Sequence, residues 1–332
     1  MERNPNRLRV AVVGVGHMGR HHLRIVSGTD GVSLAGFHDT DPSKARLFCA
    51  EYGCTAFDTL DDLLEETDAV VVAAPTSDHL EIGSRCLQHG KHLMMEKPLA
   101  DSLESAARLV KLAGEAGVIL MVGHVERYNP TIQKMMELLK SKKEEIVSVD
   151  ARRLAPFDGS RCLDVDVLYD LLIHDIDLAL EIADSDIVRV SAAGRPVFST
   201  ATDEAHVRID FSSRACAVFW AGKCSPCKMR SFTVTTPSRY LVADTLTNSL
   251  TVYRADQLPS PDQDTCFMGE IRVEQIPIPE QEPLRMELED FFAAIRDGRP
   301  PLVDGTRALH SMQALDLVAR SIESGSDIHA AR

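Results

Sequence analysis

The chain has 332 residues, of which 44% are hydrophobic and 26% charged, a balance typical of globular proteins with room for two domains. Its 36 basic and 50 acidic residues give a formal net charge of −14, which disfavours nucleic acid as a partner because phosphate contacts need clustered Lys and Arg. No apolar run approaches the roughly 18 residues of a membrane-spanning helix, and the N-terminus lacks signal-peptide features. We therefore expect a cytoplasmic protein that binds neither nucleic acid nor membrane.

Residues 8–122 alternate short apolar runs with amphipathic stretches, which is the pattern of βαβ units around a parallel sheet. The run at 69–74 is apolar throughout, as expected for a strand buried on both faces. Strands are expected at 8–13, 32–37, 69–74, 92–96 and 118–122. Helices are expected at 16–27 and 103–116.

After Gly123 the segments alternate polar with apolar residues, which indicates an antiparallel sheet with one covered face. Strands are expected at 146–154, 187–193, 205–211, 215–221, 231–235 and 249–253. Helices are expected from Asn129-Pro130 to about Leu139, at 170–183 over the sheet, and at 284–296 and 306–324. The stretch 258–283 contains five prolines and is expected to be irregular.

These patterns predict an α/β fold with two domains. An N-terminal Rossmann domain with a doubly wound parallel sheet would occupy residues 1–124. A C-terminal α/β domain with a large open, mostly antiparallel sheet would occupy residues 125–332 and serve substrate binding and oligomerisation. The terminal helices would pack back on the first domain.

The sequence Gly14-Val15-Gly16-His17-Met18-Gly19 fits G-x-G-x-x-G and lies between an expected strand and an expected helix, the context that such a motif needs. The three glycines would allow the tight turn, the approach of the pyrophosphate and the packing of helix on strand. The N–H groups at the helix start, at His17 and Met18, would also face the phosphates.

Asp39 stands twenty residues after Gly19, at the end of the second expected strand. A carboxylate there accepts hydrogen bonds from the adenosine ribose hydroxyls. A 2′-phosphate would meet the negative charge of Asp39 and Asp41, with no adjacent arginine. We therefore expect NAD rather than NADP.

The next two expected strands of the sheet also end in polar segments. Ala74 ends the expected strand 69–74, and Pro75, Thr76 and His79 follow it. The carboxyl ends of parallel strands line the ligand crevice, so these four residues are predicted to contact the cofactor. A plain strand-to-helix turn is the alternative.

Glu96-Lys97-Pro98 follows the next strand, at the same edge of the sheet. Glu96 is assigned to the cofactor crevice. The ammonium of Lys97 would bind a substrate hydroxyl and stabilise alkoxide charge. For an isolated motif of this kind an ordinary surface lysine is the better interpretation, so a partner is needed.

Asp170 and His174 are four residues apart, which places them on one face of a helix. Oxidation of an alcohol releases the hydroxyl proton, and histidine titrates near neutral pH. His174 is therefore a candidate base, while Asp170 would orient its imidazole or bind a second hydroxyl. Inert Asp-His pairs on exposed helices are common and remain the alternative.

Cys224 and Cys227 form the only C-x-x-C pair among eight cysteines. A zinc site needs about four ligands, and no second matching pair is present. We expect reduced thiols in a turn between two strands, and no metal site.

Together these segments resemble the Gfo/Idh/MocA oxidoreductase family, from Gly14 to the terminal helices. In that family the E-K-P lysine and a D-x-x-x-H pair flank the nicotinamide, which implies that Lys97, Asp170 and His174 belong to one site. The resemblance implies NAD(P)-dependent oxidation of a sugar or cyclitol hydroxyl. It also implies homodimers or homotetramers that form through an open C-terminal sheet.

Within that family, residues 123–130 and 169–177 resemble the UDP-N-acetylglucosamine 3-dehydrogenases, in which the sugar's 3-hydroxyl is oxidised to a ketone. The resemblance places Arg127 and Asn129 near the nicotinamide and the sugar. A nucleotide-sugar also needs cations for its pyrophosphate, and Arg152, Arg153 and Arg161 are candidates, with ordinary strand and loop arginines as the alternative.

Two other functions remain open. A dehydrogenase of a free sugar or inositol would share every catalytic residue. A non-catalytic NAD-binding sensor on the same fold would be expected to lack the lysine or the histidine, and both are present.

Overall fold

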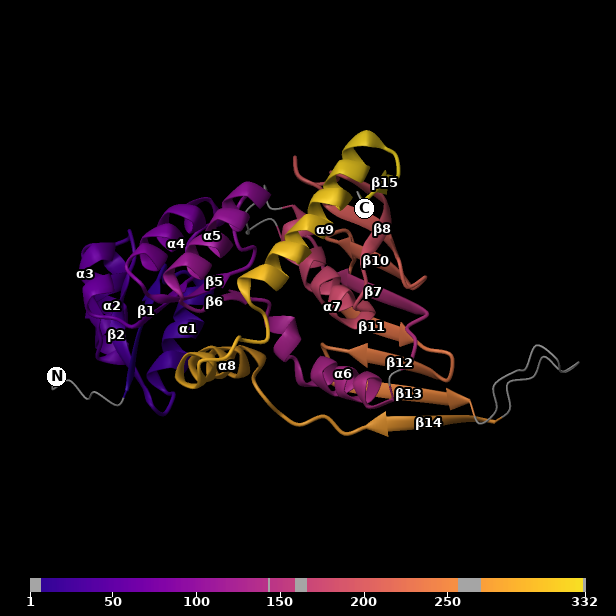
Figure 1. Ribbon diagram of the computed structural model, residues 1–332, viewed down its shortest axis with the longest axis horizontal. Helices are drawn as coiled ribbons and strands as arrows, with labels where there is room; N and C mark the ends of the chain where they lie inside the picture. Colours follow the sequence, from indigo (N-terminus) through magenta and orange to yellow (C-terminus); the bar gives the residue numbers. More distant parts are fainter. Residues whose placement is uncertain (1–6, 143, 159–165, 256–269, 331–332) are drawn as a thin grey trace, which may run out of the picture. The chain divides into compact units, whose positions relative to one another are not determined.

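The computed structural model describes residues 7–142, 144–158, 166–255 and 270–330 (Figure 1). The described chain divides into two compact units. The first contains the chain up to Val125 together with Glu282–Met312, and the second contains Glu126–Gln281 and the chain from Gln313 onward. The segment that includes the penultimate helix therefore belongs to the first unit.

The first unit is built on a parallel six-stranded sheet in the order β3-β2-β1-β4-β5-β6. The strand order reverses direction between β1 and β4, as in doubly wound Rossmann sheets, where ligands bind beyond the carboxyl ends of the strands. The strands are β1 (Leu8–Val13), β2 (Val32–His38), β3 (Thr55–Ala56), β4 (Ala69–Val72), β5 (His92–Glu96) and β6 (Leu120–Gly123). The predicted Rossmann fold is confirmed.

Helix α5 of this unit begins and ends where the sequence offers caps. Ser102 accepts a hydrogen bond from the Ser105 N–H at the start of α5 (Leu103–Ala116), and Gly117 ends it with φ +65°, a left-handed conformation that glycine adopts without strain. This helix has the predicted bounds. The others are α1 (His17–Ser27), α2 (Ser43–Tyr52), α3 (Leu60–Glu65), α4 (His79–Gln88) and α8 (Pro283–Asp297).

The second unit contains a nine-stranded sheet in the order β14-β13-β12-β11-β7-β10-β9-β8-β15. All its pairs are antiparallel except β7 with β10, so the predicted mostly antiparallel sheet is confirmed. The strands are β7 (Ser148–Leu154), β8 (Ile187–Arg195), β9 (Glu204–Phe211), β10 (Cys216–Gly222), β11 (Met229–Thr235), β12 (Arg239–Asp244), β13 (Ser249–Ala255), β14 (Ile271–Ile276) and β15 (Ile328–His329).

Two of these strands correct the sequence analysis. Residues 258–283 were expected to be irregular, yet Ile271–Ile276 pair with β13 along six residues. The sequence analysis also assigned no strand to Arg239–Asp244, which pair between β11 and β13. Strand β14 is largely exposed, so hydrogen bonds from β13 stabilise it rather than a buried apolar pattern. Strand β12 does alternate, with Leu241 and Ala243 buried in the core, and this pattern is that of a strand with one covered face.

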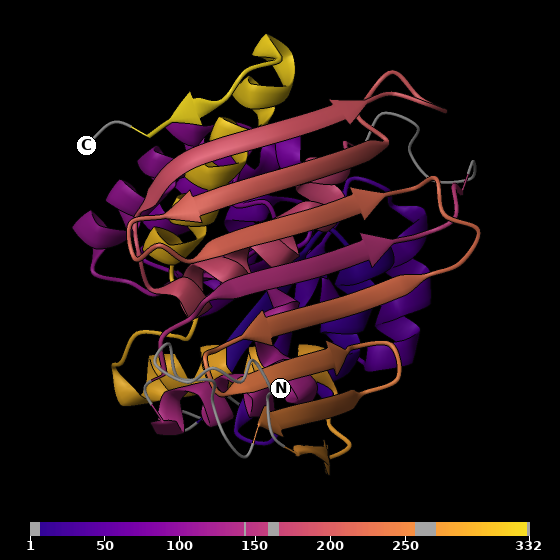
Figure 2. The ribbon, with the colours of Figure 1, turned by 90° about the vertical axis from the view of Figure 1, so that its right-hand side faces the viewer.

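The nine-stranded sheet has one covered and one open face. On β10, Ala217 and Phe219 are buried on the covered face while Val218 is 40% exposed on the other. Figure 2 shows the strands side by side with the open face toward the viewer. The helices α6 (Pro130–Lys142) and α7 (Ile173–Ala183) contact the strands of this sheet.

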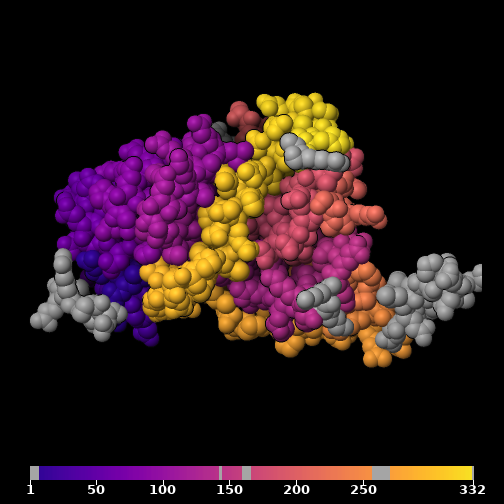
Figure 3. All heavy atoms as spheres, in the orientation of Figure 1, coloured from indigo at the N-terminus to yellow at the C-terminus, as the bar shows by residue number. Residues whose placement is uncertain are grey.

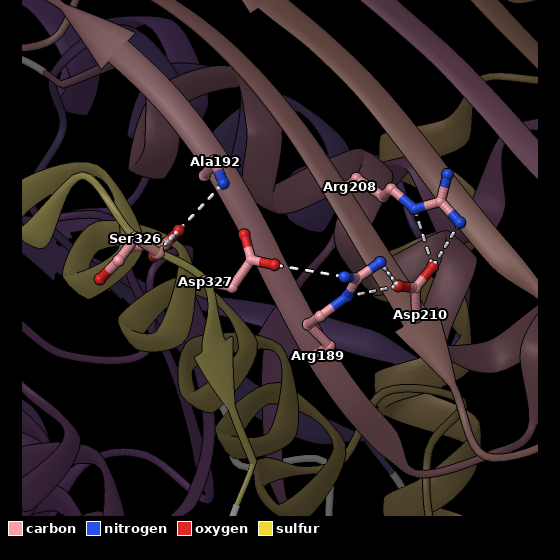
Figure 4. A network of polar contacts seen from close by, with 7 residues as sticks. Arg189, Ala192, Arg208, Asp210, Ser326 and Asp327 are labelled. Atoms are coloured by element: carbon pink, nitrogen blue, oxygen red, sulfur yellow. Dashed lines mark hydrogen bonds and ion pairs between the residues drawn. The ribbon is translucent and has the colours of Figure 1, made fainter.

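At one edge of the same sheet, hydrogen bonds and ion pairs connect β15 and the residues beside it to the neighbouring strands (Figure 4). The guanidinium of Arg189 on β8 donates to the carboxylates of Asp210 on β9 and Asp327 beside β15, at 2.6 and 3.2 Å. The Ser321 hydroxyl accepts from the Ala192 N–H and donates to the Ser326 carbonyl. These side-chain bonds hold a strand that is only two residues long.

Helix α9 (Gly305–Ser324) contains the boundary between the two units and is seen in yellow on the face drawn in Figure 3. Its first turns contribute Ala308 and Met312 to the apolar core of the first unit, and its later turns contribute Leu315 and Val318 to the core of the second. Among the described helices, none is long and apolar enough to cross a membrane.

Candidate functional site

The glycine motif forms a tight turn between β1 and α1. Gly14 has φ +80°, and a Cβ atom there would lie 2.7 Å from the backbone N of Ala74. A Cβ on Gly19 would lie 1.9 Å from the carbonyl oxygen of Gly14. At Gly16, by contrast, a Cβ would meet no atom within 4 Å. Two glycines are therefore needed for packing, and the third leaves open space over the backbone, as the approach of a dinucleotide requires.

Helix α1 starts at this turn without a side-chain cap. Gly16 is its N-cap, and the first turn, with His17 and Met18, holds no acidic residue. The N–H groups at its start therefore offer hydrogen bonds and the positive end of the helix dipole to an anion. These residues fit the pyrophosphate of a dinucleotide.

We expect Gly19→Ala to lower the affinity for NAD at least about tenfold, because the new methyl group must displace the Gly14 carbonyl that shapes the turn. Isothermal titration calorimetry with NAD measures this change. Gly114→Ala is the matched control, because Gly114 lies on α5 and a Cβ there would meet nothing within 4 Å. An unchanged dissociation constant in Gly19→Ala would contradict the assigned role of the turn.

Asp39 lies just beyond β2, with 7% of its side chain exposed. Its carboxylate accepts hydrogen bonds from the Val15 and Asp41 N–H groups at 2.7 and 2.9 Å, and from Lys44 Nζ at 2.9 Å. Burial alone would raise the pKa of Asp39, but these bonds outweigh it and lower the pKa. The carboxylate is therefore ionised and fixed beside the glycine turn. Its counter-ion, Lys44, is not among the predicted site residues.

The turn after β4 is connected to the turn after β5 by His79. This imidazole is 1% exposed, with Nε2 3.1 Å from the Ala74 carbonyl and Nδ1 3.0 Å from the Pro98 carbonyl. In the same turn, Pro75 is exposed and Thr76 is partly exposed. His79 is thus engaged inside the protein, and its predicted cofactor contact stays a prediction.

Lys97 follows the last residue of β5, and its peptide bond to Pro98 is cis. The Glu96 carboxylate accepts from the N–H of Lys97 at 3.2 Å through Oε2, and its Oε1 lies 2.8 Å from Nε2 of His22 on α1. Burial would raise the pKa of Glu96, but His22 and then Lys97 outweigh it and lower the pKa. Glu96 is therefore an ionised anchor for the lysine's main chain, and its predicted role in cofactor binding stays a prediction.

Glu287 on α8 is a second buried carboxyl in this region. It is 0% exposed, and neither oxygen has a hydrogen-bond partner among the described residues. Burial, followed by the charges of Glu96 and Asp290, raises the pKa of Glu287 well above its usual value. The raised pKa favours the protonated form of Glu287, and the lowered pKa of Glu96 keeps the negative charge of this buried pair on Glu96.

A raised pKa in the folded state means that protonation of Glu287 stabilises the fold, and this stabilisation is lost as pH rises through the raised pKa. Glu287→Gln mimics the protonated form at every pH. We expect the melting temperature of the variant to equal that of the wild type near pH 4.5 and to exceed it by at least about 2 °C at pH 8, the shift that roughly 1 kcal/mol produces in a large domain. A constant difference across this pH range, measured by calorimetry, would contradict the assignment.

In the second unit, Asp170 and His174 lie at the start of the helix that covers the sheet. Residues Leu168–Leu172 form a π-helical turn, and α7 begins only at Ile173, so the prediction of a regular helix from Asp170 is wrong in its first turn. Such turns occur frequently at functional sites. Nζ of Lys223 lies 3.6 Å from the Asp170 carboxylate. His174 is half-buried.

Asp175, the residue after His174, belongs to a buried network of ion pairs. The guanidinium of Arg153 on β7 donates to both oxygens of the Asp175 carboxylate at 2.7 and 2.9 Å, and to Glu126 at 2.9 Å. Burial would lower the pKa of Arg153, but these carboxylates raise it. A contact of Arg153 with a substrate would require these bonds to open, so its predicted phosphate contact stays a prediction.

The other residues predicted to bind substrate have structural partners. Arg127 is 2% exposed, and its guanidinium lies 2.9 Å from Glu181. Asn129 caps α6, where its Oδ1 accepts from the Thr131 N–H at 3.0 Å. Arg152 is exposed on the same strand as Arg153. Arg161 lies outside the described residues.

Among the described residues the cysteines are free, and Cys224 and Cys227 are exposed between β10 and β11, as predicted. No group of His, Cys, Asp or Glu in the described ranges is arranged to hold a metal ion.

Five further residues beside these sites were not predicted. Two of them could have been found by spacing, since His22 lies three residues beyond Gly19 and Asp175 directly follows His174. Lys223, Arg230 and Glu287 gave no such signal. Arg230 on β11 pairs opposite Arg153, and burial and the charge of Arg153 lower its pKa.

Two family models match the chain. Residues 8–124 match the oxidoreductase family Gfo/Idh/MocA, described as an NAD-binding Rossmann fold. Residues 145–238 match the C-terminal domain of the same family. The family description confirms the expected cofactor, NAD.

Characterised relatives span nearly the whole chain. The UDP-N-acetylglucosamine 3-dehydrogenase of Acidithiobacillus ferrooxidans is 32% identical over 96% of this chain and 98% of its own length. The NAD-dependent scyllo-inositol 2-dehydrogenase of Bacillus subtilis is 24% identical over 97% of this chain and 96% of its own.

Solved structures agree with this relationship. The structure of the Acidithiobacillus ferrooxidans enzyme has a TM-score of 0.88 at 31% identity, over 96% of this chain and 98% of that one. An oxidoreductase from Agrobacterium radiobacter in complex with NAD⁺ shares the fold, with a TM-score of 0.85 at 16% identity over 97% and 98% of the two chains. The chain therefore belongs to the Gfo/Idh/MocA family and is an NAD-dependent oxidoreductase.

Proposed function

We propose that this enzyme oxidises the 3-hydroxyl of UDP-N-acetylglucosamine, or of a closely similar nucleotide-sugar, to a ketone. The observation that carries the proposal is the 32% identity to a UDP-N-acetylglucosamine 3-dehydrogenase over 96% of the chain. The chemistry of Lys97, Asp170 and His174 agrees with that reaction. The match covers 98% of the relative's own length.

In this proposal each side chain has one task. Lys97 donates a hydrogen bond to the reacting hydroxyl and stabilises the alkoxide charge as it develops. His174 accepts the hydroxyl proton, directly or through Lys97. Asp170 binds a neighbouring hydroxyl or orients His174. NAD, when bound, accepts the hydride from the sugar carbon.

The proposed substrate also carries a diphosphate, which needs cations. Arg153 is already neutralised by Asp175 and Glu126. Lys223, 3.6 Å from the Asp170 carboxylate, and Arg230, opposite Arg153 on the neighbouring strand, are further cations in the same unit. We therefore add Lys223 and Arg230 to Arg161 as candidates for the diphosphate. Arg152 is no longer a candidate, because it lies with Asp150 and Val218 on the open face of the sheet, away from Asp175 and His174.

The test is the absorbance of NADH at 340 nm with purified protein, NAD and UDP-N-acetylglucosamine. A ketone trap is included because the oxidation of a ring hydroxyl by NAD is uphill. NADP, free N-acetylglucosamine and myo-inositol serve as controls. NADH formed with the UDP-sugar alone is the expected result.

Each of the other outcomes points to one alternative. Reduction of NAD by N-acetylglucosamine or myo-inositol, but not by the UDP-sugar, would replace the proposal with a free-sugar or inositol dehydrogenase. Binding of NAD without its reduction by any of these substrates would favour a non-catalytic sensor. Faster reduction of NADP than of NAD would contradict the cofactor preference.

We also propose that the protein forms homodimers or homotetramers through the open face of the nine-stranded sheet. Tyr240, Tyr253 and Val273 lie in register on three neighbouring strands and are 46%, 38% and 57% exposed. An exposed apolar row of this kind is typical of interaction surfaces. Light scattering after size exclusion should give two or four times the chain mass of 36.5 kDa, and a monomer would contradict the proposal.

A further inference from the structure

Buried histidines hold the main chain on both sides of Lys97. On one side, the Glu96 carboxylate accepts from the N–H of Lys97 at 3.2 Å and lies 2.8 Å from Nε2 of His22. On the other side, the Pro98 carbonyl lies 3.0 Å from Nδ1 of His79. His22 and His79 are 0% and 1% exposed. Carboxylates only accept hydrogen bonds, so Nε2 of His22 donates to Glu96. Nε2 of His79 also lies 3.1 Å from the Ala74 carbonyl, and a neutral imidazole has one N–H, so we assign the proton of His79 to Nδ1, which then donates to Pro98.

We propose that His22 and His79 are positioning residues, which hold the backbone of Lys97 so that its ammonium is placed for the reaction. This inference rests on the proposed function of Lys97. His22 acts through Glu96, and His79 acts through Pro98.

The two histidines lie on helices that begin next to the predicted cofactor-binding segments. His22 lies on α1, which begins at the glycine turn, and His79 begins α4, just after the turn that follows β4. Both helices therefore start at segments predicted to bind the cofactor, and both also determine where Lys97 lies. Gly123 on β6 pairs beside Glu96, and a Cβ there would lie 3.1 Å from its Oε2, so a glycine leaves room for the carboxylate.

Buried hydrogen bonds of this kind are stronger than exposed ones, because the surroundings have a low dielectric constant. Their effect on catalysis is geometric, since a displacement of about 1 Å at a reacting group costs about 10²-fold in rate. Neither imidazole needs to touch the substrate to have this effect. Loss of such a hydrogen bond is therefore expected to lower kcat rather than to weaken the binding of NAD.

The two imidazoles use different nitrogens, and this permits a matched exchange of variants. The amide nitrogen of glutamine lies near the place of Nε2, and that of asparagine near the place of Nδ1. His22→Gln therefore keeps the donor to Glu96, whereas His22→Asn places it too far away. At position 79 the order reverses, because His79→Asn keeps the donor to Pro98 and His79→Gln loses it.

We expect His22→Gln to keep kcat within about threefold of the wild type, and His79→Asn to keep more of it than His79→Gln does. His22→Asn and His79→Gln should lower kcat by about 10- to 100-fold, with the dissociation constant of NAD unchanged in His22→Asn. His89→Gln is the control, because the exposed imidazole of His89 also bonds a backbone carbonyl, that of Arg85, and should show no effect.

A second readout needs no substrate. Acetylation of Lys97 by acetic anhydride, followed by peptide mass spectrometry, reports the freedom of its amine, with Lys111, 76% exposed on its side chain, as internal reference. The rate at Lys97 relative to Lys111 should rise at least about threefold in His22→Asn and His79→Gln only.

The outcomes separate this inference from the proposed function. Equal kcat and equal acetylation in the two variants at each position would overturn the positioning role. If instead no sugar reduces NAD in the wild type, the proposed function fails, while the acetylation pattern still decides whether the histidines hold Lys97.

Discussion

Replacement of Lys97 by methionine is expected to lower kcat by about 10²–10³-fold, because the variant loses the cation that stabilises the alkoxide. His174→Ala should cause a loss of about 10² or more, the usual effect of removing a general base. Steady-state kinetics with NAD and the nucleotide-sugar measure both. The affinity for NAD should stay within about threefold, since neither side chain belongs to the glycine turn or to Asp39.

The matched control is Lys111→Met, which removes an exposed lysine on α5 whose nearest acidic partner is Glu115 at 3.7 Å. This variant should keep the wild-type rate. Lys97→Met or His174→Ala with a rate close to that of the wild type would remove the corresponding residue from the mechanism.

Replacement of Arg153 by methionine is expected to lower the free energy of unfolding by about 3–5 kcal/mol, because it leaves the buried carboxylate of Asp175 without its counter-ion. Burial already raises the pKa of Asp175 even with Arg153 present. The melting temperature should fall by about 6 °C or more, which calorimetry measures. Because Asp175 follows His174 directly, the variant should also lose activity.

Arg152→Met tests the same strand one residue earlier. Arg152 is 49% exposed on its side chain and lies 3.4 Å from the exposed Asp150, so its loss should change stability by less than about 1 kcal/mol. Arg153→Met combined with Asp175→Asn should recover part of the loss, since the second change removes the unpaired charge. Equal melting temperatures for Arg152→Met and Arg153→Met would contradict the role of the buried network.

Much of the fold could be predicted from local patterns. The bounds of α5 and β5 agree with the structure, because an apolar run buried on both faces and a helix with Ser102 and Gly117 at its ends have local causes. The glycine turn was equally clear, since φ +80° at Gly14 and the close approach at Gly19 demand glycine. Strand β14 escaped prediction because it is largely exposed and hydrogen bonds to β13 decide it. Strand β12 has a local signal, the alternation of the buried Leu241 and Ala243 with more exposed residues, and could have been predicted.

The candidate site, like the fold, has some features that the sequence predicts and others that it does not. The sequence by itself determined the chemical types at the ends of the strands: the glycine turn, the carboxylate of Asp39 and the ammonium of Lys97. Only the tertiary structure decided which charged groups are already engaged. It pairs Arg153 with Asp175 and Lys44 with Asp39, and it buries His22, His79 and Glu287. The physical reason is that burial and ion pairing depend on residues distant in the chain, whose meeting no local pattern encodes.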